Sequence, residues 1–143
     1  MRLTNYTDYS LRVLIYLAAE HNGKLANIKE IAETYDISKN HLMKIIYNLG
    51  KMGYIDTIRG RNGGIRLAKI PSEINIGEIV RKTEEDFNIV ECFDKENNKC
   101  IISQDCTLKH ILNKAMNEFL AVLDQYTLED ITKNKLSLNE YFK

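Results

Sequence analysis

Apolar side chains recur at three- and four-residue intervals along residues 11–19. This spacing places them on one face of an α-helix, so the pattern predicts a first helix over residues 7–20 with one buried face. Asn5, with Asp8 three residues later, resembles a capping box and would start this helix slightly earlier.

Two further helices are predicted beyond a turn at residues 21–24. Asn27 is a favourable N-cap for a short helix over residues 28–35, and Ser38 is one for a longer helix that ends near Gly53. Because only two residues separate these helices, they must cross rather than run antiparallel, which is the geometry of a helix-turn-helix.

The period of the apolar pattern changes after this third helix. Residues 54–58 and 65–68 are short β-type runs, and the glycine-rich stretch from Arg59 to Gly64 is typical of a hairpin tip. Helix, turn, helix and hairpin in this order predict a winged helix.

The following stretch contains one short helix and a long irregular segment. Asn75 is expected to cap a helix over residues 76–83, whereas no period persists from residue 84 to residue 105. An irregular run of this length is uncommon in a small domain unless a ligand, a metal or another function organises it.

A long helix with a broad apolar face is predicted from a cap at Thr107 to about residue 126. A lone helix with such a face needs a partner, so we expect it to mediate dimerisation. Beyond it, Thr127 resembles the cap of a short helix, and the tail from Lys133 is expected to fray. The apolar seam of the long helix comprises Leu108, Leu112, Ala115, Phe119, Val122 and Tyr126.

Together these elements predict a mainly α fold with a small β-hairpin wing, in which a winged helix-turn-helix precedes a long C-terminal dimerisation helix. We expect a DNA-binding domain over residues 1–71, a linker helix with a cysteine-containing loop over residues 72–106, and the dimerisation helix with its tail over residues 107–143. A chain of 143 residues has the size of one domain, with little room for a separate catalytic one.

The formal net charge of zero conceals an asymmetry between the two halves of the chain. Residues 1–71 carry 11 Lys and Arg against 6 Asp and Glu, a charge of +5, whereas residues 72–143 carry 9 against 14, a charge of −5. A basic half beside an acidic half fits a module that binds a polyanion. Neither a signal-peptide pattern nor an apolar run of about 18 residues is present, so we expect a cytoplasmic protein.

In a helix-turn-helix, the N-terminal residues of the second helix face the base edges of the major groove. Asparagine can bond adenine, lysine can reach guanine or a phosphate, and serine can bind a phosphate. Taken singly, the helix could equally be a solvated surface and the hairpin an ordinary polar loop. The order of helix, turn, helix and basic hairpin favours a surface that binds nucleic acid. The expected DNA-binding residues are Ser38, Lys39, Asn40, His41 and Lys44 in the helix and Arg59, Arg61 and Asn62 at the hairpin tip.

The three cysteines, Cys92, Cys100 and Cys106, are separated by seven and then five residues. An odd number of thiols in a cytoplasmic chain argues against disulfides and favours a metal. This spacing is loose for zinc, which generally uses closer pairs, whereas thiolates also bind iron–sulfur clusters that have a fourth ligand other than cysteine. Zinc and three unrelated buried thiols remain alternatives.

The spacing does not identify a fourth ligand. Asp105 and His110 are the local candidates, and a partner subunit could contribute Asp8. His110 also fits a solvent-facing position on the long helix. An acidic residue such as Asp8 is also favourable near a helix N-terminus, because it interacts with the helix dipole.

Five segments, together with the three cysteines, resemble the IscR/NsrR family of winged-helix repressors, and the similarity covers nearly the whole chain. The chain is most similar to the nitric-oxide-responsive branch of that family. The segments are MRLTNYTDYSLR (1–12), SKNHLMKII (38–46), RGRNGGIRL (59–67), IGEIVR (76–81) and LDQYTL (123–128).

The resemblance implies a homodimeric repressor that binds operator DNA while an iron–sulfur cluster, 4Fe-4S or else 2Fe-2S, is intact and releases DNA after nitrosylation. The family's three cluster cysteines match Cys92, Cys100 and Cys106. In the nitric-oxide-responsive branch an aspartate in the partner's first helix completes the site, and Asp8 occupies that place. The IscR branch instead uses a histidine where this chain has Lys109.

Two other functions fit parts of the sequence. A related regulator that responds to iron–sulfur status or redox would share every motif, and only the response to nitric oxide separates the two. An electron-transfer or metal-handling protein does not require a recognition helix and a wing, and it would show no salt-dependent DNA binding. An enzyme is not expected, because no paired carboxylates, nucleophile with a base, or phosphate loop stand at suitable spacing.

Overall fold

The computed structural model describes residues 1–20 and 24–142. Its first helix, α1 (Asn5–Glu20), begins two residues earlier than the apolar period predicts. Thr4 caps it, because Thr4 Oγ1 accepts a hydrogen bond from the Thr7 N–H at 3.3 Å, so the expected Asn5 capping box is wrong. Residues 21–23 of the predicted turn lie outside the described residues.

Local capping sets the ends of α2 (Ile28–Tyr35) and α3 (Lys39–Lys51). The Asn27 side chain accepts a hydrogen bond from the N–H of the second residue of α2, and the Ser38 side chain accepts one from the third residue of α3, which confirms both predicted N-caps. Asp36 adopts a left-handed conformation, with φ of 52°, and ends α2. The two helices therefore cross at a short turn, as a helix-turn-helix requires.

The apolar stripe predicted for α3 faces α1 in the core. Its residues are buried together with one face of α1, and this packing fixes the orientation of the opposite, solvent-facing side of α3. The buried side chains are Leu42, Ile45, Ile46 and Leu49 of α3 and Val13, Leu14 and Leu17 of α1.

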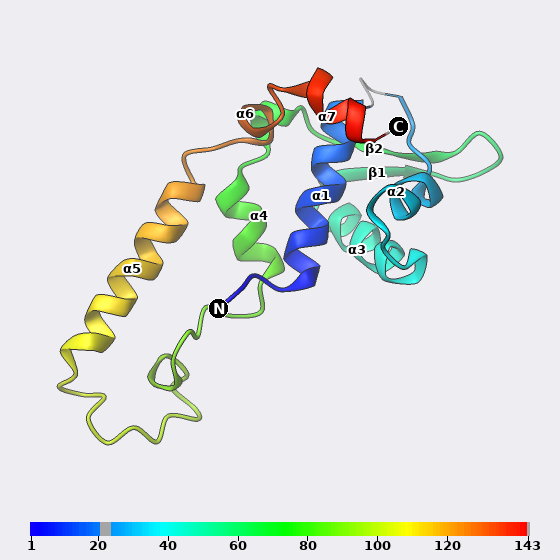
Figure 1. Ribbon diagram of the computed structural model, residues 1–143. Helices are drawn as coiled ribbons and strands as arrows, with labels where there is room; N and C mark the ends of the chain where they lie inside the picture. The colour runs from blue at the N-terminus through cyan, green and yellow to red at the C-terminus, as the bar shows by residue number, and fades with distance from the viewer. Residues whose placement is uncertain (21–23, 143) are drawn as a thin grey trace.

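The predicted hairpin consists of β1 (Ile55–Ile58) and β2 (Gly64–Leu67), which pair antiparallel. Gly60 at its tip has φ of 111°, a conformation that L side chains rarely adopt. Ala26, just before α2, exchanges two backbone hydrogen bonds of 2.7 and 2.9 Å with Ile65, the second residue of β2. The hairpin projects beside α2 and α3 as a wing (Figure 1).

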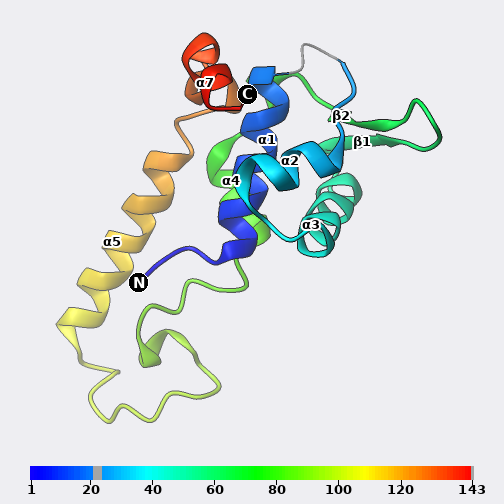
Figure 2. The same ribbon diagram turned by 45° about the vertical axis from the view of Figure 1, so that its right-hand side comes forward.

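Helix α4 (Ile76–Thr83) follows a 3-10 turn at Pro71–Glu73 and lies beside α1 (Figures 1 and 2). Asn75 caps it as predicted, by accepting a hydrogen bond from the N–H of Glu78 at 3.0 Å. The segment after α4 is irregular except for a 3-10 turn at Glu91–Phe93, in agreement with its lack of period.

Helix α5 (Thr107–Leu123) stands apart from the rest of the protomer over most of its length (Figures 1 and 2). Cys106 occupies the N-cap position without a side-chain hydrogen bond, so Thr107 is the first helical residue and not the predicted cap. The helix also ends three residues before the predicted end, because Asp124 begins a turn that is bonded to α4.

Asp124 joins the end of α5 to α4. Its carboxylate forms two hydrogen bonds with the Arg81 guanidinium, one of them 2.8 Å long, and its carbonyl accepts a 2.7 Å hydrogen bond from Asn75 Nδ2. The hydrogen bonds from Arg81 lower the pKa of the Asp124 carboxyl below its ordinary value. Gly77 lies so close that an added Cβ would be 2.9 Å from the Asp124 backbone nitrogen. The C-terminal end of α5 is therefore held firmly.

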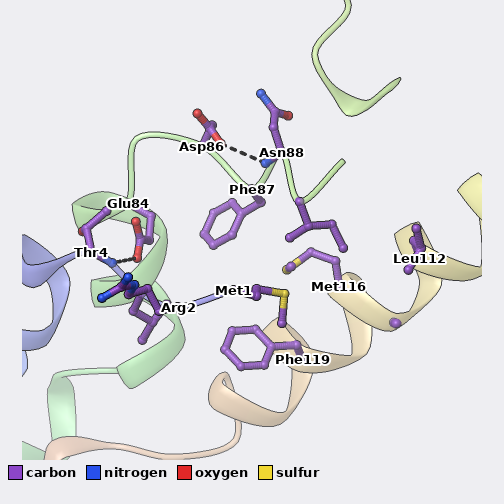
Figure 3. Close-up of a pocket in the computed structure, with 13 residues that line it drawn as sticks. Met1, Arg2, Thr4, Glu84, Asp86, Phe87, Asn88, Leu112, Met116 and Phe119 are labelled. Carbon is purple, nitrogen blue, oxygen red and sulfur yellow. Dashed lines mark hydrogen bonds between the residues drawn. The ribbon is translucent and has the colours of Figure 1, made fainter. Parts of the chain in front are cut away.

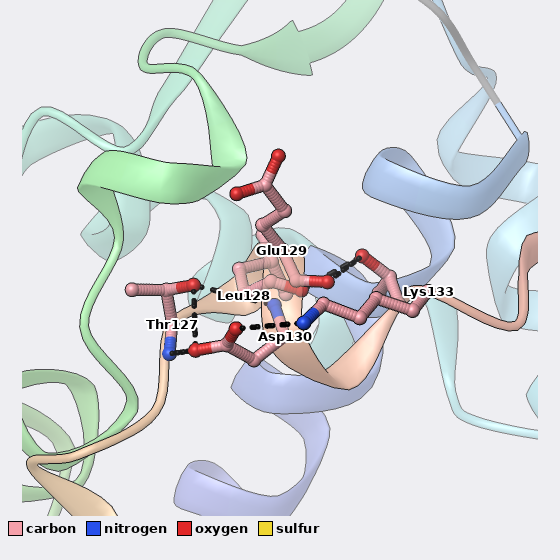
Figure 4. Close-up of polar contacts among 6 residues, drawn as sticks. Thr127, Leu128, Glu129, Asp130 and Lys133 are labelled. Carbon is pink, nitrogen blue, oxygen red and sulfur yellow. Dashed lines mark hydrogen bonds and ion pairs between the residues drawn. The ribbon is translucent and has the colours of Figure 1, made fainter.

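Two short helices return the chain to α1. Helix α6 (Leu128–Ile131) begins with a capping box, in which the Thr127 hydroxyl accepts a hydrogen bond from the Asp130 N–H and the Asp130 carboxylate accepts one from the Thr127 N–H (Figure 4). This confirms the predicted cap. Lys133 lies 3.4 Å from the same carboxylate.

The chain beyond Lys133 forms helix α7 (Lys135–Tyr141), so the expectation of a frayed tail is wrong. The Phe142 ring packs 5.0 Å from the ring of Tyr16 and 5.8 Å from that of Tyr35, measured between centroids. These aromatic contacts dock the C-terminal helix on α1 and α2.

Candidate nucleic-acid interface and metal-binding segment

The N-terminal end of α3 presents the residues expected to bind DNA. Ser38, Lys39, Asn40 and Lys44 are exposed, and Asn40 and Lys44 lie on the side of the helix opposite its buried stripe. Helix α3 contains no acidic residue, so its outer surface carries positive charge only. This combination suits a negatively charged groove.

His41 differs from its exposed neighbours because it is partly buried. Its ring contacts the ring of Tyr9 edge-on, with centroids 5.3 Å apart. This contact links α3 to α1.

The wing places all three of its predicted residues at the surface. Arg59, Arg61 and Asn62 are exposed at the hairpin tip. Within the described ranges neither arginine of the tip takes part in an ion pair, whereas Arg66 at the other end of the hairpin lies 3.9 Å from Asp56. The tip is therefore a compact cationic surface at the end of a rigid hairpin.

The sequence reasoning missed two further residues on the outer face of α3. Tyr47 is 66% exposed, and Lys51 Nζ lies 5.6 Å from the centroid of its ring. The available signal was helical spacing, because both positions lie opposite the buried stripe.

The three cysteines lie on the irregular segment that leads into α5. All are free thiols; Cys92 and Cys106 are partly buried and Cys100 is exposed. The structure does not bring them together, because in the part of the chain that it describes no three His, Cys, Asp or Glu side chains could hold one metal ion. The donor set nevertheless fits an iron–sulfur cluster, since three free cysteines on one largely irregular segment supply the sulfur ligands that such clusters use.

The three candidates for a fourth ligand differ in their surroundings. Asp105 and His110 are exposed. Asp8 is about half exposed and already has a partner, since its two carboxylate oxygens accept hydrogen bonds of 3.1 and 2.7 Å from Arg12 on the next turn. The Arg12 guanidinium also lies over the rings of Tyr9 and Tyr35.

A cavity of about 650 Å³ separates α5 from the N-terminal segment and the chain after α4 (Figure 3). Its lining is mostly apolar and includes Met1, Phe87, Met116 and Phe119. Lined in this way, the cavity offers few ligands to a metal and suits apolar contacts instead.

The face of α5 next to this cavity is an exposed apolar stripe. Leu108, Ile111 and Val122 are each at least half exposed, and they lie along one side of the helix with Ala115 and Phe119. A contiguous apolar surface of this kind on a single protomer marks an interaction surface.

Comparison with known proteins identifies close relatives of the chain. The model of the Rrf2 family, described as an iron-dependent transcriptional regulator, matches residues 3–134. The HTH-type transcriptional regulator NsrR of Bacillus subtilis (strain 168) is 67% identical over 143 residues, which covers 100% of this chain and 98% of that protein. Its namesake in Geobacillus kaustophilus (strain HTA426) is 53% identical over 143 residues, with 100% and 97% covered.

Solved structures of regulators share the fold. The oxidized form of Staphylococcus aureus CymR has a TM-score of 0.76 at 26% identity and covers 93% of this chain and 97% of its own. T. potens IscR has a TM-score of 0.71 at 25% identity, with 94% and 88% covered. These relatives are regulators and not enzymes, and the predicted fold class is confirmed. Among the described residues, no helix has the length and apolar character needed to cross a bilayer.

Proposed function

Because this chain belongs to the Rrf2 family of transcriptional regulators, we propose that it is a cytoplasmic repressor that senses nitric oxide through an iron–sulfur cluster. Cys92, Cys100 and Cys106 would hold the cluster, of 4Fe-4S type in our proposal, with 2Fe-2S as the alternative. Operator DNA would be bound by the N-terminal end of α3 and the tip of the wing.

One observation carries the proposal. Three free thiols lie on a single irregular segment, in a chain that is 67% identical to a regulator named NsrR. Drawing the thiols together would order this segment and set the position of the start of α5, because Cys106 is the N-cap of that helix. When bound, the cluster supplies iron atoms to which nitric oxide binds.

We propose a homodimer in which two copies of the exposed stripe on α5 pack together. Such packing would bury Leu108, Ile111 and Val122, which are exposed on one protomer. A two-fold dimer presents two recognition helices, and these must match half-sites about one DNA turn or a multiple apart. Small rotations between the protomers therefore change the affinity for an operator.

Asp8 of the partner subunit is the fourth ligand in this proposal. Its neighbour Tyr9 touches His41 on α3, so a change in the position of α1 at Asp8 acts directly beside the recognition helix. Arg12, which holds the Asp8 carboxylate in the protomer, would have to release it.

The test is an anaerobic purification with absorbance, iron and sulfide analysis, followed by titration with nitric oxide. Binding is followed by fluorescence anisotropy with a duplex that the loaded protein selects from a randomised pool. We expect the loaded protein to bind tightly and to release the duplex on nitrosylation. Cys100→Ala should lose both the cluster and the response, whereas Gln104→Ala, an exposed neighbour, should keep both. Iron-free protein that binds the duplex equally well would contradict the proposal.

A second candidate is a related regulator that responds to iron–sulfur status or redox. The similarity of the fold to IscR and to the oxidized form of CymR favours it. The same titration separates the two, because this candidate loses DNA when the cluster is removed but not when nitric oxide is added at low stoichiometry.

A further inference from the structure

The outer face of α3 continues beyond the residues at its N-terminal end. Successive residues of an α-helix are about 100° apart, so four side chains of α3 fall within about 60° of one another around the axis. This line lies opposite the buried stripe. Its members are Asn40, Lys44, Tyr47 and Lys51.

The second half of this line is a tyrosine and a lysine in contact. Tyr47 is 66% exposed, although tyrosine carries a large apolar ring, and the Lys51 ammonium lies 5.6 Å from the ring centroid. Among the described residues Lys51 forms no ion pair, and α3 has no acidic residue that could neutralise it. The ring limits the freedom of the ammonium without neutralising its charge.

The length of α3 relates this pair to the width of a DNA groove. Lys51 lies eleven residues after Asn40, which places the two about 16 Å apart along the helix, while the major groove is about 12 Å wide. With Asn40 and Lys44 at the base edges, Tyr47 and Lys51 are carried to the sugar-phosphate backbone at the edge of the groove.

We propose that Tyr47 and Lys51 form a phosphate-binding pair for the DNA backbone. The Lys51 ammonium binds one phosphate oxygen, the Tyr47 hydroxyl donates a hydrogen bond to another, and the Tyr47 ring holds the ammonium in place. The inference rests on the proposed DNA binding by α3 and extends that surface into the second half of the helix. DNA is the occupant because the charged side chains of this face, Lys44 and Lys51, are both cationic and because the face is continuous with the helix-turn-helix surface.

Binding of phosphate by lysine is tested by the salt dependence of binding to DNA of any sequence. The full-length protein is titrated with a fluorescent 30-base-pair duplex of mixed sequence between about 50 and 200 mM salt. Lys51→Gln should weaken binding roughly three- to tenfold at low salt and lower the log–log salt slope by about 1, because one phosphate is no longer neutralised. Lys133→Gln, an exposed lysine outside the helix-turn-helix and the wing, removes the same charge and should change neither quantity.

The role of the tyrosine is separated by two substitutions. Tyr47→Phe keeps the ring and should weaken binding roughly two- to fivefold without changing the salt slope, since it removes a hydrogen-bond donor that carries no charge. Tyr47→Ala should weaken binding further, and adding Lys51→Gln to it should cost less than Lys51→Gln alone, because the two side chains act together.

The outcomes separate this inference from the proposed function. Wild-type protein without salt-dependent binding would overturn both. If wild type binds but Lys51→Gln and Tyr47→Ala behave like Lys133→Gln, only the pair is overturned. Circular dichroism of each variant checks folding, which we expect to be unchanged because both side chains are exposed.

Discussion

Asp8 is the proposed fourth ligand of the cluster, and its substitution tests that role. Substitution of Arg12, its ion-pair partner, is the matched control. In the loaded protein, Asp8→Ala should shorten the lifetime of the cluster absorbance under a chelator several-fold, because the cluster then lacks one ligand. Arg12→Ala breaks the same ion pair but leaves the carboxylate, so its cluster should persist.

Asp8→Ala should melt close to wild type, whereas Arg12→Ala, which also loses its contacts with the Tyr9 and Tyr35 rings, should melt slightly lower. The two side chains are 43% and 40% exposed, and a pair this open contributes only about 0.5 kcal/mol. Equal loss of the cluster in the two variants would rule out Asp8 as a ligand.

Tyr35 gives the fold a sensitivity to alkaline pH. Burial raises the pKa of Tyr35 from 10.0 to about 12, against the opposing effect of Arg12, and its hydroxyl donates a 3.1 Å hydrogen bond to the Arg12 carbonyl. Because the folded-state pKa is the higher one, this stability is complete below about pH 10 and is lost as the pH rises to about 12.

Chemical denaturation between pH 9 and about pH 12 measures this effect. After allowance for partial exposure of the ring, we expect ionisation of Tyr35 to cost on the order of 1 kcal/mol of unfolding free energy over that interval. Tyr35→Phe should remove this part of the pH dependence, while Tyr141→Phe, at an 81% exposed ring, should retain it. Identical profiles for wild type and Tyr35→Phe would contradict the assignment.

The junction of α4 with α5 depends on a glycine. A Cβ at Gly77 would overlap the Asp124 carboxylate, which Arg81 holds, and would lie 2.9 Å from the Asp124 backbone nitrogen. Gly77→Ala should therefore lower the unfolding free energy by about 1–3 kcal/mol, although alanine is the better helix former.

Gly50 in α3 is the matched control for this substitution. A Cβ there would meet only the Ile55 carbonyl, at an ordinary 3.6 Å, so Gly50→Ala should stabilise by about 0.5–1 kcal/mol. Urea denaturation of both variants measures the difference, and a neutral or stabilising Gly77→Ala would show that α5 can move away without cost.

The sequence predicted those elements whose ends are set by local chemistry. Asn27, Ser38, Asn75 and Thr127 cap helices where expected, because a cap is a contact between a side chain and its own next turn. Helix α7 could not be predicted, because it is stabilised by tertiary contacts of Phe142 with rings far away in sequence.

The sequence predicts the DNA-binding surface of the candidate site but not the arrangement of its cysteines. The outer face of α3 follows from helical spacing alone, including its second half with Tyr47 and Lys51. The convergence of three thiols does not follow from spacing, because the segment that bears them is irregular apart from the 3-10 turn at Glu91–Phe93, and no repeating geometry relates their positions.

The apolar stripe of α5 predicts that two protomers associate. Ile111→Glu places a charge on the stripe at a side chain that is 58% exposed in the protomer, so it should disrupt the dimer and leave the protomer's own core intact. Asn117→Glu adds the same charge on the opposite side of α5, where the side chain is exposed, and should remain dimeric.

Light scattering after size exclusion gives the mass of each variant, and circular dichroism reports whether it is folded. The wild-type protein is expected at twice its 16.6 kDa protomer mass. A dimeric Ile111→Glu would place the subunit interface elsewhere on the molecule.

The backbone hydrogen bonds between Ala26 and Ile65 bear on which operators such a regulator would bind. Since the wing is hydrogen-bonded to the chain just ahead of α2, we expect the hairpin, α2 and α3 to move together as one rigid DNA-binding unit. A signal that shifts one subunit against the other would therefore leave the base preference of each DNA-binding unit unchanged. It would alter only the distance between the two units. The signal would then discriminate between promoters by the number of base pairs between their half-sites and not by the sequence of each half-site.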